Sequence, residues 1–198
     1  MYSLAGNLLG VIDALGNESQ YTYDEVDQLI EVRQIKEANE KNAVLSVTKY
    51  ERDLLGNIMK TTDALGNSES YTYDKKSQLI QKIDKEGYLT TYGYQSSGEV
   101  ESIKYADGKQ VRLSYNALRQ LEEMEDWLGI TRIQVDATGK ATKVSYPDGK
   151  EVGYTYGKAG EKTKITYPDG AEVNYAYDEL YRLAKVTDEA GEIGRAHV

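Results

Sequence analysis

Cysteine and phenylalanine are absent from this 198-residue chain, which has two prolines and one histidine. Without cysteine there is no disulfide framework, thiol nucleophile or cysteine-rich metal site. The one histidine, His197, lies at the very end of the chain, so a Ser–His–Asp triad or a histidine-bound metal elsewhere is excluded. We therefore expect no cofactor, no metal and no enzymatic activity, although paired-carboxylate catalysis is left open.

Long apolar runs and excess positive charge are also lacking. No segment approaches the roughly 20 apolar residues of a membrane span, and no signal peptide is visible after Met1. The formal net charge is −9, with 33 acidic against 24 basic residues. Since a phosphate-binding surface needs clustered Lys and Arg, nucleic acid is not an expected partner.

Tyrosine and glycine are abundant instead, with 18 of each. Tyrosine has an apolar ring and a hydroxyl that needs water or a partner, so these rings supply most of the half-buried surface. Glycine at this level without a Gly-X-Y period indicates many tight turns.

The chain repeats itself at intervals of about 21 residues. Asp13–Asn17 recurs as Asp63–Asn67, and Tyr21–Asp24 recurs as Tyr71–Asp74. We take the residue at the position of Asp24 as the landmark of each copy. The landmarks are Ser3, Asp24, Asp53, Asp74, Gln95, Asn116, Asp136, Gly157 and Asp178, at spacings of 21, 29, 21, 21, 21, 20, 21 and 21. We predict one array of nine copies over 1–191, interrupted by an insertion at 36–43.

Two turns are expected in each copy. The first contains Gly6, Gly56, Gly98, Gly139 and Gly160, with Asp27, Ser77, Arg119 and Tyr181 as departures. The second contains Gly16, Gly66, Gly87, Gly108, Gly129, Gly149, Gly170 and Gly191. The Pro-Asp-Gly copies fit a type I turn closed by a glycine at positive φ.

Between the turns, apolar and polar residues alternate, and Thr, Val, Ile and Tyr dominate, as in β-strands. Two tyrosines two residues apart precede most landmarks, so both rings face the same side of the strand. This predicts a tyrosine stripe, formed by Tyr21, Tyr23, Tyr71, Tyr73, Tyr92, Tyr94, Tyr154, Tyr156, Tyr175 and Tyr177. The favoured role of the stripe is packing, and an aromatic binding platform is the alternative.

The fold class that follows is all-β, a tandem series of β-hairpins in an antiparallel meander. Only the 36–43 insertion is expected to form a loop or a short helical turn, and it is a candidate contact loop for a partner. Residues 192–198 do not continue the pattern and are expected to be a tail or a cloning remnant. Trp127 is interpreted as a local packing variation rather than a binding residue.

The unit Tyr-Asp-x-x-Gly-x-Leu, best matched from Tyr23, Tyr73 and Tyr177 onward, resembles the YD repeat of the Rhs family. That family includes bacterial Rhs and wall-associated toxins, the C components of Tc toxins, and teneurins. The resemblance covers residues 2–191. It implies a long antiparallel sheet that curves or spirals into a β-shell, which in bacterial members encloses a C-terminal toxin.

Two functions are therefore weighed. The first is a structural shell segment of a secreted or cell-surface protein, whose partners are neighbouring repeats or an enclosed toxin domain. The second is a repeat module that binds carbohydrate or a cell surface through the tyrosine face or the insertion. Free sheet edges also predict self-association. A β-propeller is disfavoured because the two Pro-Asp-Gly copies are adjacent, and calcium binding at the Asp-Gly turns lacks a denser Asp and Gly pattern.

Overall fold

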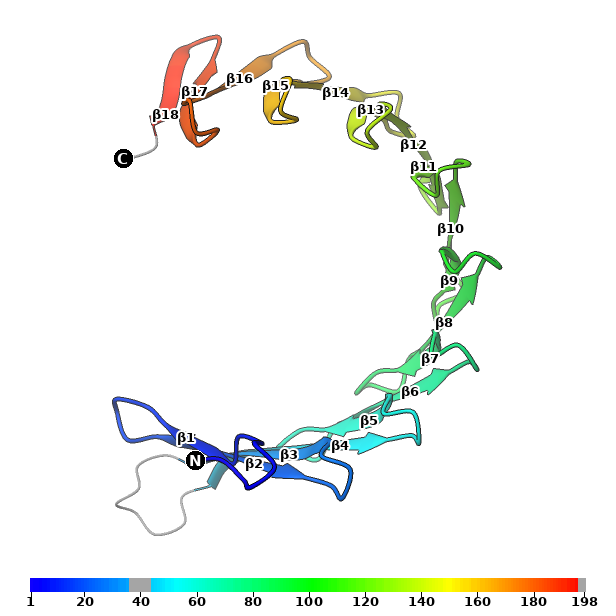
Figure 1. The fold of residues 1–198 in the computed structure, drawn as a ribbon. Helices are drawn as coiled ribbons and strands as arrows, with labels where there is room; N and C mark the ends of the chain where they lie inside the picture. Colours follow the sequence, from blue (N-terminus) through cyan, green and yellow to red (C-terminus); the bar gives the residue numbers. More distant parts are fainter. Residues whose placement is uncertain (36–43, 196–198) are drawn as a thin grey trace. The chain divides into compact units, whose positions relative to one another are not determined.

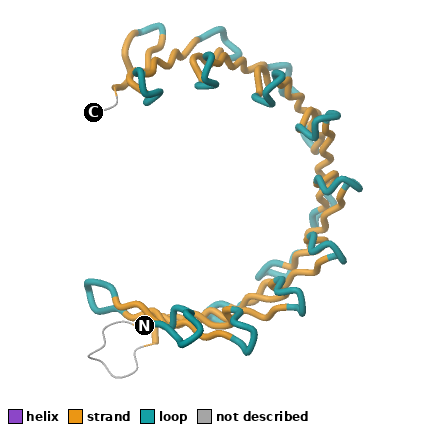
Figure 2. Tube along the Cα trace, viewed as in Figure 1, coloured by secondary structure: helices purple, strands orange, loops and turns teal. Residues whose placement is uncertain are grey.

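The computed structural model describes residues 1–35 and 44–195, and the predicted insertion at 36–43 lies outside this range. The described residues form strands, turns and loops, without a helix (Figure 2). They divide into two compact units, which are Met1–Gly93 with Lys104–Gly108, and Tyr94–Ile103 with Lys109–Val198. The single array over 1–191 remains a prediction.

The first unit is a meander of antiparallel hairpins in chain order (Figure 1). Its strands are β1 (Gly10–Ile12), β2 (Glu18–Tyr23), β3 (Leu29–Ile35), β4 (Val44–Arg52), β5 (Ile58–Thr62), β6 (Ser68–Tyr73), β7 (Leu79–Ile83) and β8 (Leu89–Tyr94), which ends at the boundary with the second unit. Odd-numbered strands follow the first turn of a copy and are called return strands. Even-numbered strands lead to the next landmark and are called outgoing strands.

The second unit repeats this plan from β10 to β18. Its strands are β9 (Val100–Lys104), β10 (Gln110–Tyr115), β11 (Leu121–Asp126), β12 (Gly129–Val135), β13 (Ala141–Ser145), β14 (Glu151–Tyr156), β15 (Lys162–Thr166), β16 (Glu172–Tyr177), β17 (Leu183–Asp188) and β18 (Gly191–Arg195). The odd and even roles are the same as in the first unit.

A β-bulge lies immediately before the second tyrosine of the pair in most copies. The register shifts between Thr22 and Tyr23 and between Thr155 and Tyr156, so each of these tyrosines lies opposite the first residue of the return strand. A bulge adds one residue to one strand and increases its local twist. Because the shift recurs at the same place in successive copies, the bulge is part of the repeat.

Very few side chains are buried within either unit. Val111, at 9% exposure, is the sole buried hydrophobic side chain among the described residues. Stability therefore depends on contacts between adjacent strands and adjacent copies.

Residues 192–195, which the sequence analysis assigned to a tail, form a strand, and the interpretation of 192–198 as a cloning remnant stays a prediction. Residues 192–195 belong to β18, which pairs with β17 from Asp188↔Gly191 to Lys185↔Arg195. The pairing needs only backbone groups and a tight turn at Gly191, with φ of +124°, so it does not require the alternation that the prediction looked for. Residues 196–198 lie outside the described residues.

The first prediction concerns the left-handed turn residues. Gly149 has φ of +83°, whereas Tyr181 already holds φ of +58° with a side chain. Gly149→Val places a β-branched residue in this strained region and is expected to destabilise the chain by about 2 kcal/mol. Tyr181→Val is expected to have the smaller effect, measured by urea denaturation. Equal losses at both positions would contradict the turn register.

Candidate functional site

The tyrosine pairs share one side of their strands. In β14, Tyr154 and Tyr156 are half-buried while Thr155 between them is exposed, and β16 shows the same alternation at Tyr175 and Tyr177. The same holds in β2 and β6. Tyr154 lies opposite Ile165 on the return strand, so the ring packs beside an aliphatic side chain. This surface, with the return-strand residues opposite it, is called the tyrosine face.

The second tyrosine of each pair connects its copy to the preceding one. Its hydroxyl donates a hydrogen bond to the carbonyl 15 residues earlier, at or next to the start of the preceding return strand. The bonds are Tyr23 to Leu8 (3.0 Å), Tyr73 to Ile58 (2.9 Å), Tyr115 to Val100 (2.8 Å), Tyr156 to Ala141 (2.9 Å) and Tyr177 to Lys162 (2.9 Å). Burial raises the pKa of the Tyr73 and Tyr115 hydroxyls, which keeps these groups as donors.

Arg52 takes over this function in the copy that follows the insertion. Its Nε donates to the Leu29 carbonyl at 3.2 Å, and its Nη1 donates to the Gly56 carbonyl at 2.9 Å. Leu29 begins a return strand, as Ile58 does, and the sequence separation is 23 because the insertion adds eight residues. The sequence analysis had no role for Arg52, although its place before a landmark was the available signal.

A side-chain acceptor closes the first turn. In the copy of Asp24, Oδ1 accepts hydrogen bonds from the amides of Val26 (3.0 Å) and Gln28 (2.8 Å). Asp53, Asp74, Asn116 and Asp178 accept the same pair of amide bonds in their copies. Such bonds stabilise the ionised carboxylate, and they contribute to the lowered pKa of Asp53, where the Asn57 side chain has the largest effect.

In two of the copies without a landmark aspartate, a glutamate stands four residues after the landmark. Their landmarks are Gln95 and Gly157, and the glutamates are Glu99 and Glu161. A Cβ at Gly157 would collide with the Glu161 carboxylate, which therefore fills the space of the missing side chain. Hydrogen bonds from the side chains of Ser97 and Arg119 lower the pKa of Glu99. Each glutamate keeps one buried oxygen without a hydrogen bond.

A second connection between copies lies at the first turn. The residue four after a landmark, called the covering residue, lies over the left-handed residue of the next copy. Gln28 covers Gly56, Gln120 covers Gly139, and Lys140 covers Gly160. The absent Cβ of each glycine leaves the space that the long covering side chain fills.

At three of the four positions where the left-handed residue is not glycine, it is bonded to the covering residue of the preceding copy. Asn7 donates to Asp27 at 2.5 Å and Asn57 donates to Ser77 at 3.0 Å, while Arg119 forms an ion pair with Glu99. These bonds offset the strain of a side chain at φ near +60°. The sequence analysis recorded Asp27, Ser77, Arg119 and Tyr181 as departures. The pairing of Asp27, Ser77 and Arg119 with residues 20 positions earlier was the missed signal.

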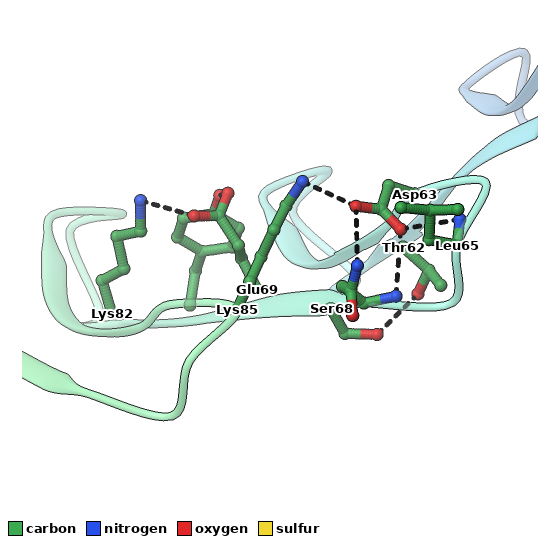
Figure 3. A network of polar contacts seen from close by, with 9 residues as sticks. Thr62, Asp63, Leu65, Ser68, Glu69, Lys82 and Lys85 are labelled. Atoms are coloured by element: carbon green, nitrogen blue, oxygen red, sulfur yellow. Dashed lines mark hydrogen bonds and ion pairs between the residues drawn. The ribbon is translucent and has the colours of Figure 1, made fainter.

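Polar contacts also join copies at the second turn (Figure 3). Lys85 Nζ lies 2.7 Å from Asp63 Oδ2, and Asp63 Oδ1 accepts from the amides of Leu65 and Asn67 at 2.9 Å each. The ammonium group of Lys85 has the largest effect and lowers the pKa of Asp63 to about 2. The aspartate therefore closes its own turn and binds the following one.

The tyrosine face also carries charged side chains. Glu69 Oε2 accepts from the Tyr71 hydroxyl at 2.9 Å, and Glu69 Oε1 pairs with Lys82 Nζ at 2.8 Å (Figure 3). Lys82 also lies 5.8 Å from the centroid of the Tyr71 ring. Elsewhere on this face, Lys162 lies 4.7 Å from the Tyr154 ring and Lys140 lies 5.5 Å from the Tyr156 ring.

Trp127 lies at a turn tip rather than in a packed layer. The turn between β11 and β12 contains two residues, Trp127 and Leu128, since Asp126 pairs with Gly129. Trp127 is 54% exposed, and Lys109 Nζ lies 5.0 Å from its ring centroid. A groove of about 510 Å³ beside this turn is lined by Leu128, Tyr146, Pro147, Asp148, Lys150 and Pro168.

Within the described ranges, no three acidic or metal-binding side chains gather at one point. The same ranges contain no helix long and apolar enough to cross a membrane. The candidate site is therefore extended: the tyrosine face together with its two rows of turns.

The second prediction isolates the tyrosine hydroxyl. Tyr177→Phe keeps the ring and removes the bond to Lys162, so a loss of about 1 kcal/mol in unfolding free energy is expected. Tyr181→Phe is the matched control, because this tyrosine is 61% exposed at a turn tip of the same copy. Urea denaturation measures both variants. If Tyr177→Phe were as stable as the control, the Tyr177 hydroxyl would not contribute to the stability of the fold.

The third prediction concerns acid. The pKa of Asp63 is lowered to about 2, so its ionised form stabilises the fold above the ordinary pKa near 4, and this contribution is lost as pH falls from about 4 to 2. The stability difference between the wild type and Asp63→Asn should be constant above pH 5 and shrink below pH 4. Lys85→Met should reduce the pH-dependent part. A difference that does not change with pH would contradict the ion pair.

The comparisons with known proteins agree with this geometry. The RHS Repeat model matches residues 135–172 and 163–193, and the Teneurin YD-shell model matches residues 1–124. No curated protein matches the sequence.

Three similar solved structures show the same fold. The TcdB2-TccC3 complex without its hypervariable C-terminal region has a TM-score of 0.66 at 16% identity, covering 95% of this chain and 13% of that chain. The TcdB2-TccC3-Cdc42 complex has a TM-score of 0.65 at 17% identity, covering 93% of this chain and 12% of that chain. The Photorhabdus luminescens Tc holotoxin pore with the TccC3-D651A mutation has a TM-score of 0.66 at 17% identity, covering 95% of this chain and 12% of that chain. The chain thus spans about an eighth of each neighbour's length. Since the shell model covers well over half of the sequence, this chain belongs to the teneurin YD-shell family, and its C-terminal part carries RHS repeats.

Proposed function

We propose that the chain is a wall segment of a β-shell. The observation that carries this proposal is the bond between copies, in which one tyrosine hydroxyl after another is joined to the backbone of the preceding hairpin. Each copy is fixed by its neighbours and not by a core. Such a sheet extends by adding copies and acts as a surface.

The two faces of the sheet differ in the way that a wall requires. Opposite the tyrosine face, ion pairs cross between neighbouring strands, which suits a solvated surface. They include Lys60–Glu51 (3.3 Å), Arg132–Glu123 (3.1 Å), Lys143–Glu151 (2.6 Å) and Lys164–Glu172 (2.8 Å). The tyrosine face is the more apolar side and is the one that we assign to the interior.

The turn tips supply a second support. Leu4 and Leu54 at first turns are fully exposed, and Leu15 and Leu65 at second turns are more than 80% exposed. Exposed leucines in rows on both margins of the hairpins are costly in water and suit burial against further hairpins. A wall of several adjacent rows would cover both margins.

The similar structures extend the proposal. They are components of Tc toxin complexes, and one is described as lacking a hypervariable C-terminal region. By this likeness, the complete shell would enclose a C-terminal toxin and act outside the cell that makes it. The enclosed domain and neighbouring repeats would be its partners.

Carbohydrate binding through the tyrosine face is the competing function, and the geometry disfavours it. Lysine side chains lie over the Tyr154 and Tyr156 rings, and the Tyr156 hydroxyl is already bonded to Ala141. A sugar that stacks on these rings would have to displace both kinds of contact.

The fourth prediction separates the two functions. Tyr154→Ser and Tyr175→Ser should each cost about 2 kcal/mol, roughly half the loss for a fully buried aromatic ring, and the wild type should bind no glycan on an array. Tyr181→Ser at a turn tip is the control and should lose little stability. The opposite result would be a glycan that binds the wild type and neither Tyr→Ser variant, while the denaturation midpoints of both variants stay unchanged. That result would contradict the wall proposal and favour a binding module.

The proposed enclosure of a C-terminal region is tested separately, by protection from protease. Residues 1–198 are grafted in place of the aligned segment of the TcdB2-TccC3 chain, and the protein is treated with protease. The C-terminal region should stay intact when the graft is wild type. Cleavage of that region in a folded graft would contradict enclosure, without affecting the result on stability.

A further inference from the structure

Two turns of the second unit share the sequence Tyr-Pro-Asp-Gly. They join β13 to β14 and β15 to β16, and they contain Asp148–Gly149 and Asp169–Gly170. In both turns the glycine amide donates to the tyrosine carbonyl at 3.0 Å, and the tyrosine amide donates to the carbonyl four residues later at 2.8 Å. The glycines have φ of +83° and +89°, so the two turns have nearly the same backbone. The third Asp-Gly pair, Asp107–Gly108, follows alanine instead of proline and is not matched to them.

The two aspartates differ in what holds the side-chain carboxylate. Each accepts a hydrogen bond through Oδ1 from the amide two residues later, from Lys150 at 3.1 Å and from Ala171 at 3.0 Å. Lys150 adds its ammonium group, whose Nζ lies 2.7 Å from Asp148 Oδ2, and this contact lowers the pKa of Asp148. Ala171 has only a methyl group in that place, so Asp169 receives no such cation from its own turn.

An Asp-Gly sequence contains both partners of an intramolecular reaction. The glycine amide nitrogen attacks Cγ of the aspartate, a C–N bond forms, and one carboxyl oxygen leaves as water with the amide proton and the acid proton. Glycine favours the attack because no Cβ crowds its nitrogen. Water then opens the succinimide ring. Opening at Cγ restores aspartate, whereas opening at the original backbone carbonyl leaves the chain running through Cγ, which is isoaspartate.

We infer that Asp169–Gly170 is a modification site of the folded chain, where isoaspartate forms spontaneously, and that Lys150 protects Asp148–Gly149 from the same reaction. Attack requires the protonated carboxyl group, since an ionised carboxylate is a poor electrophile. The ammonium group of Lys150 favours the ionised form of Asp148 and holds its Oδ2. The product at Asp169 is the residue that isoaspartyl carboxyl methyltransferases recognise.

Isoaspartate lengthens the backbone of the turn by one carbon atom. Two backbone hydrogen bonds close this turn, from Gly170 to Tyr167 and from Tyr167 to Ala171. A longer main chain does not keep both in the same geometry, and the strand pairing of β15 with β16 begins directly beyond them, at Thr166↔Glu172. The reaction therefore weakens the β15–β16 hairpin. This consequence does not depend on the proposed wall function.

The fifth prediction is tested by ageing the intact, folded chain for weeks at mildly acidic pH. Peptide mapping by mass spectrometry, with methyl transfer by an isoaspartyl methyltransferase, measures isoaspartate at each turn. It should accumulate at Asp169 about 2- to 5-fold faster than at Asp148, the size expected for one exposed ion pair. Lys150→Ala should raise the rate at Asp148 to that at Asp169, and Ala171→Lys should lower the rate at Asp169.

Two controls separate the ion pair from the local sequence. Synthetic peptides of residues 144–153 and 165–174 keep the sequences but not the folded turns, so their two rates should differ less than in the folded chain. High salt screens an exposed ion pair and should narrow the difference in the folded chain. Equal rates at the two aspartates, an unchanged Asp148 rate in Lys150→Ala, or an equally large difference between the peptides would each overturn the assignment.

Discussion

The hydrogen bond from one tyrosine hydroxyl to the preceding hairpin is the interaction on which the rest of this structure depends. The apolar burial that stabilises most domains is small here, and Val111 is the only buried hydrophobic residue described. A tyrosine ring covers part of the neighbouring copy and its hydroxyl satisfies a carbonyl there. Arg52 makes the same bond without a ring, whereas Val135 stands at the same position of its copy and has no side-chain donor.

The turns meet a second requirement, the closure of a tight loop in every copy. At most landmarks a side-chain oxygen accepts from the turn amides, as Asp24 does, and at Gly157 the Glu161 carboxylate fills the space of the missing side chain. A left-handed residue must follow, and most copies fill the place with glycine or with a side chain that has a partner in the preceding copy. Variation at these positions is therefore correlated between neighbouring copies.

The copies therefore share one backbone plan, but the residues that meet between neighbouring copies differ from place to place. A glycine such as Gly160 accepts a long neighbour such as Lys140, whereas Ser77 is matched by the shorter Asn57. Each junction thus favours the neighbour that it has. In a wall built from similar hairpins, this pairing opposes the slippage to which repetitive sheets are prone.

The sequence by itself determined the repeat, the two turns and the alternation that places Tyr154 and Tyr156 on one side, because these depend on local periodicity and on φ preferences. It did not show that Tyr156 bonds Ala141, that Asn57 reaches Ser77, or that residues 192–195 form a strand. Only the tertiary structure decided these. The two side-chain bonds join residues 15 and 20 positions apart in neighbouring copies, and the strand at 192–195 depends on backbone pairing with β17. The bulge just before the second tyrosine sets which residues of the two strands lie opposite each other.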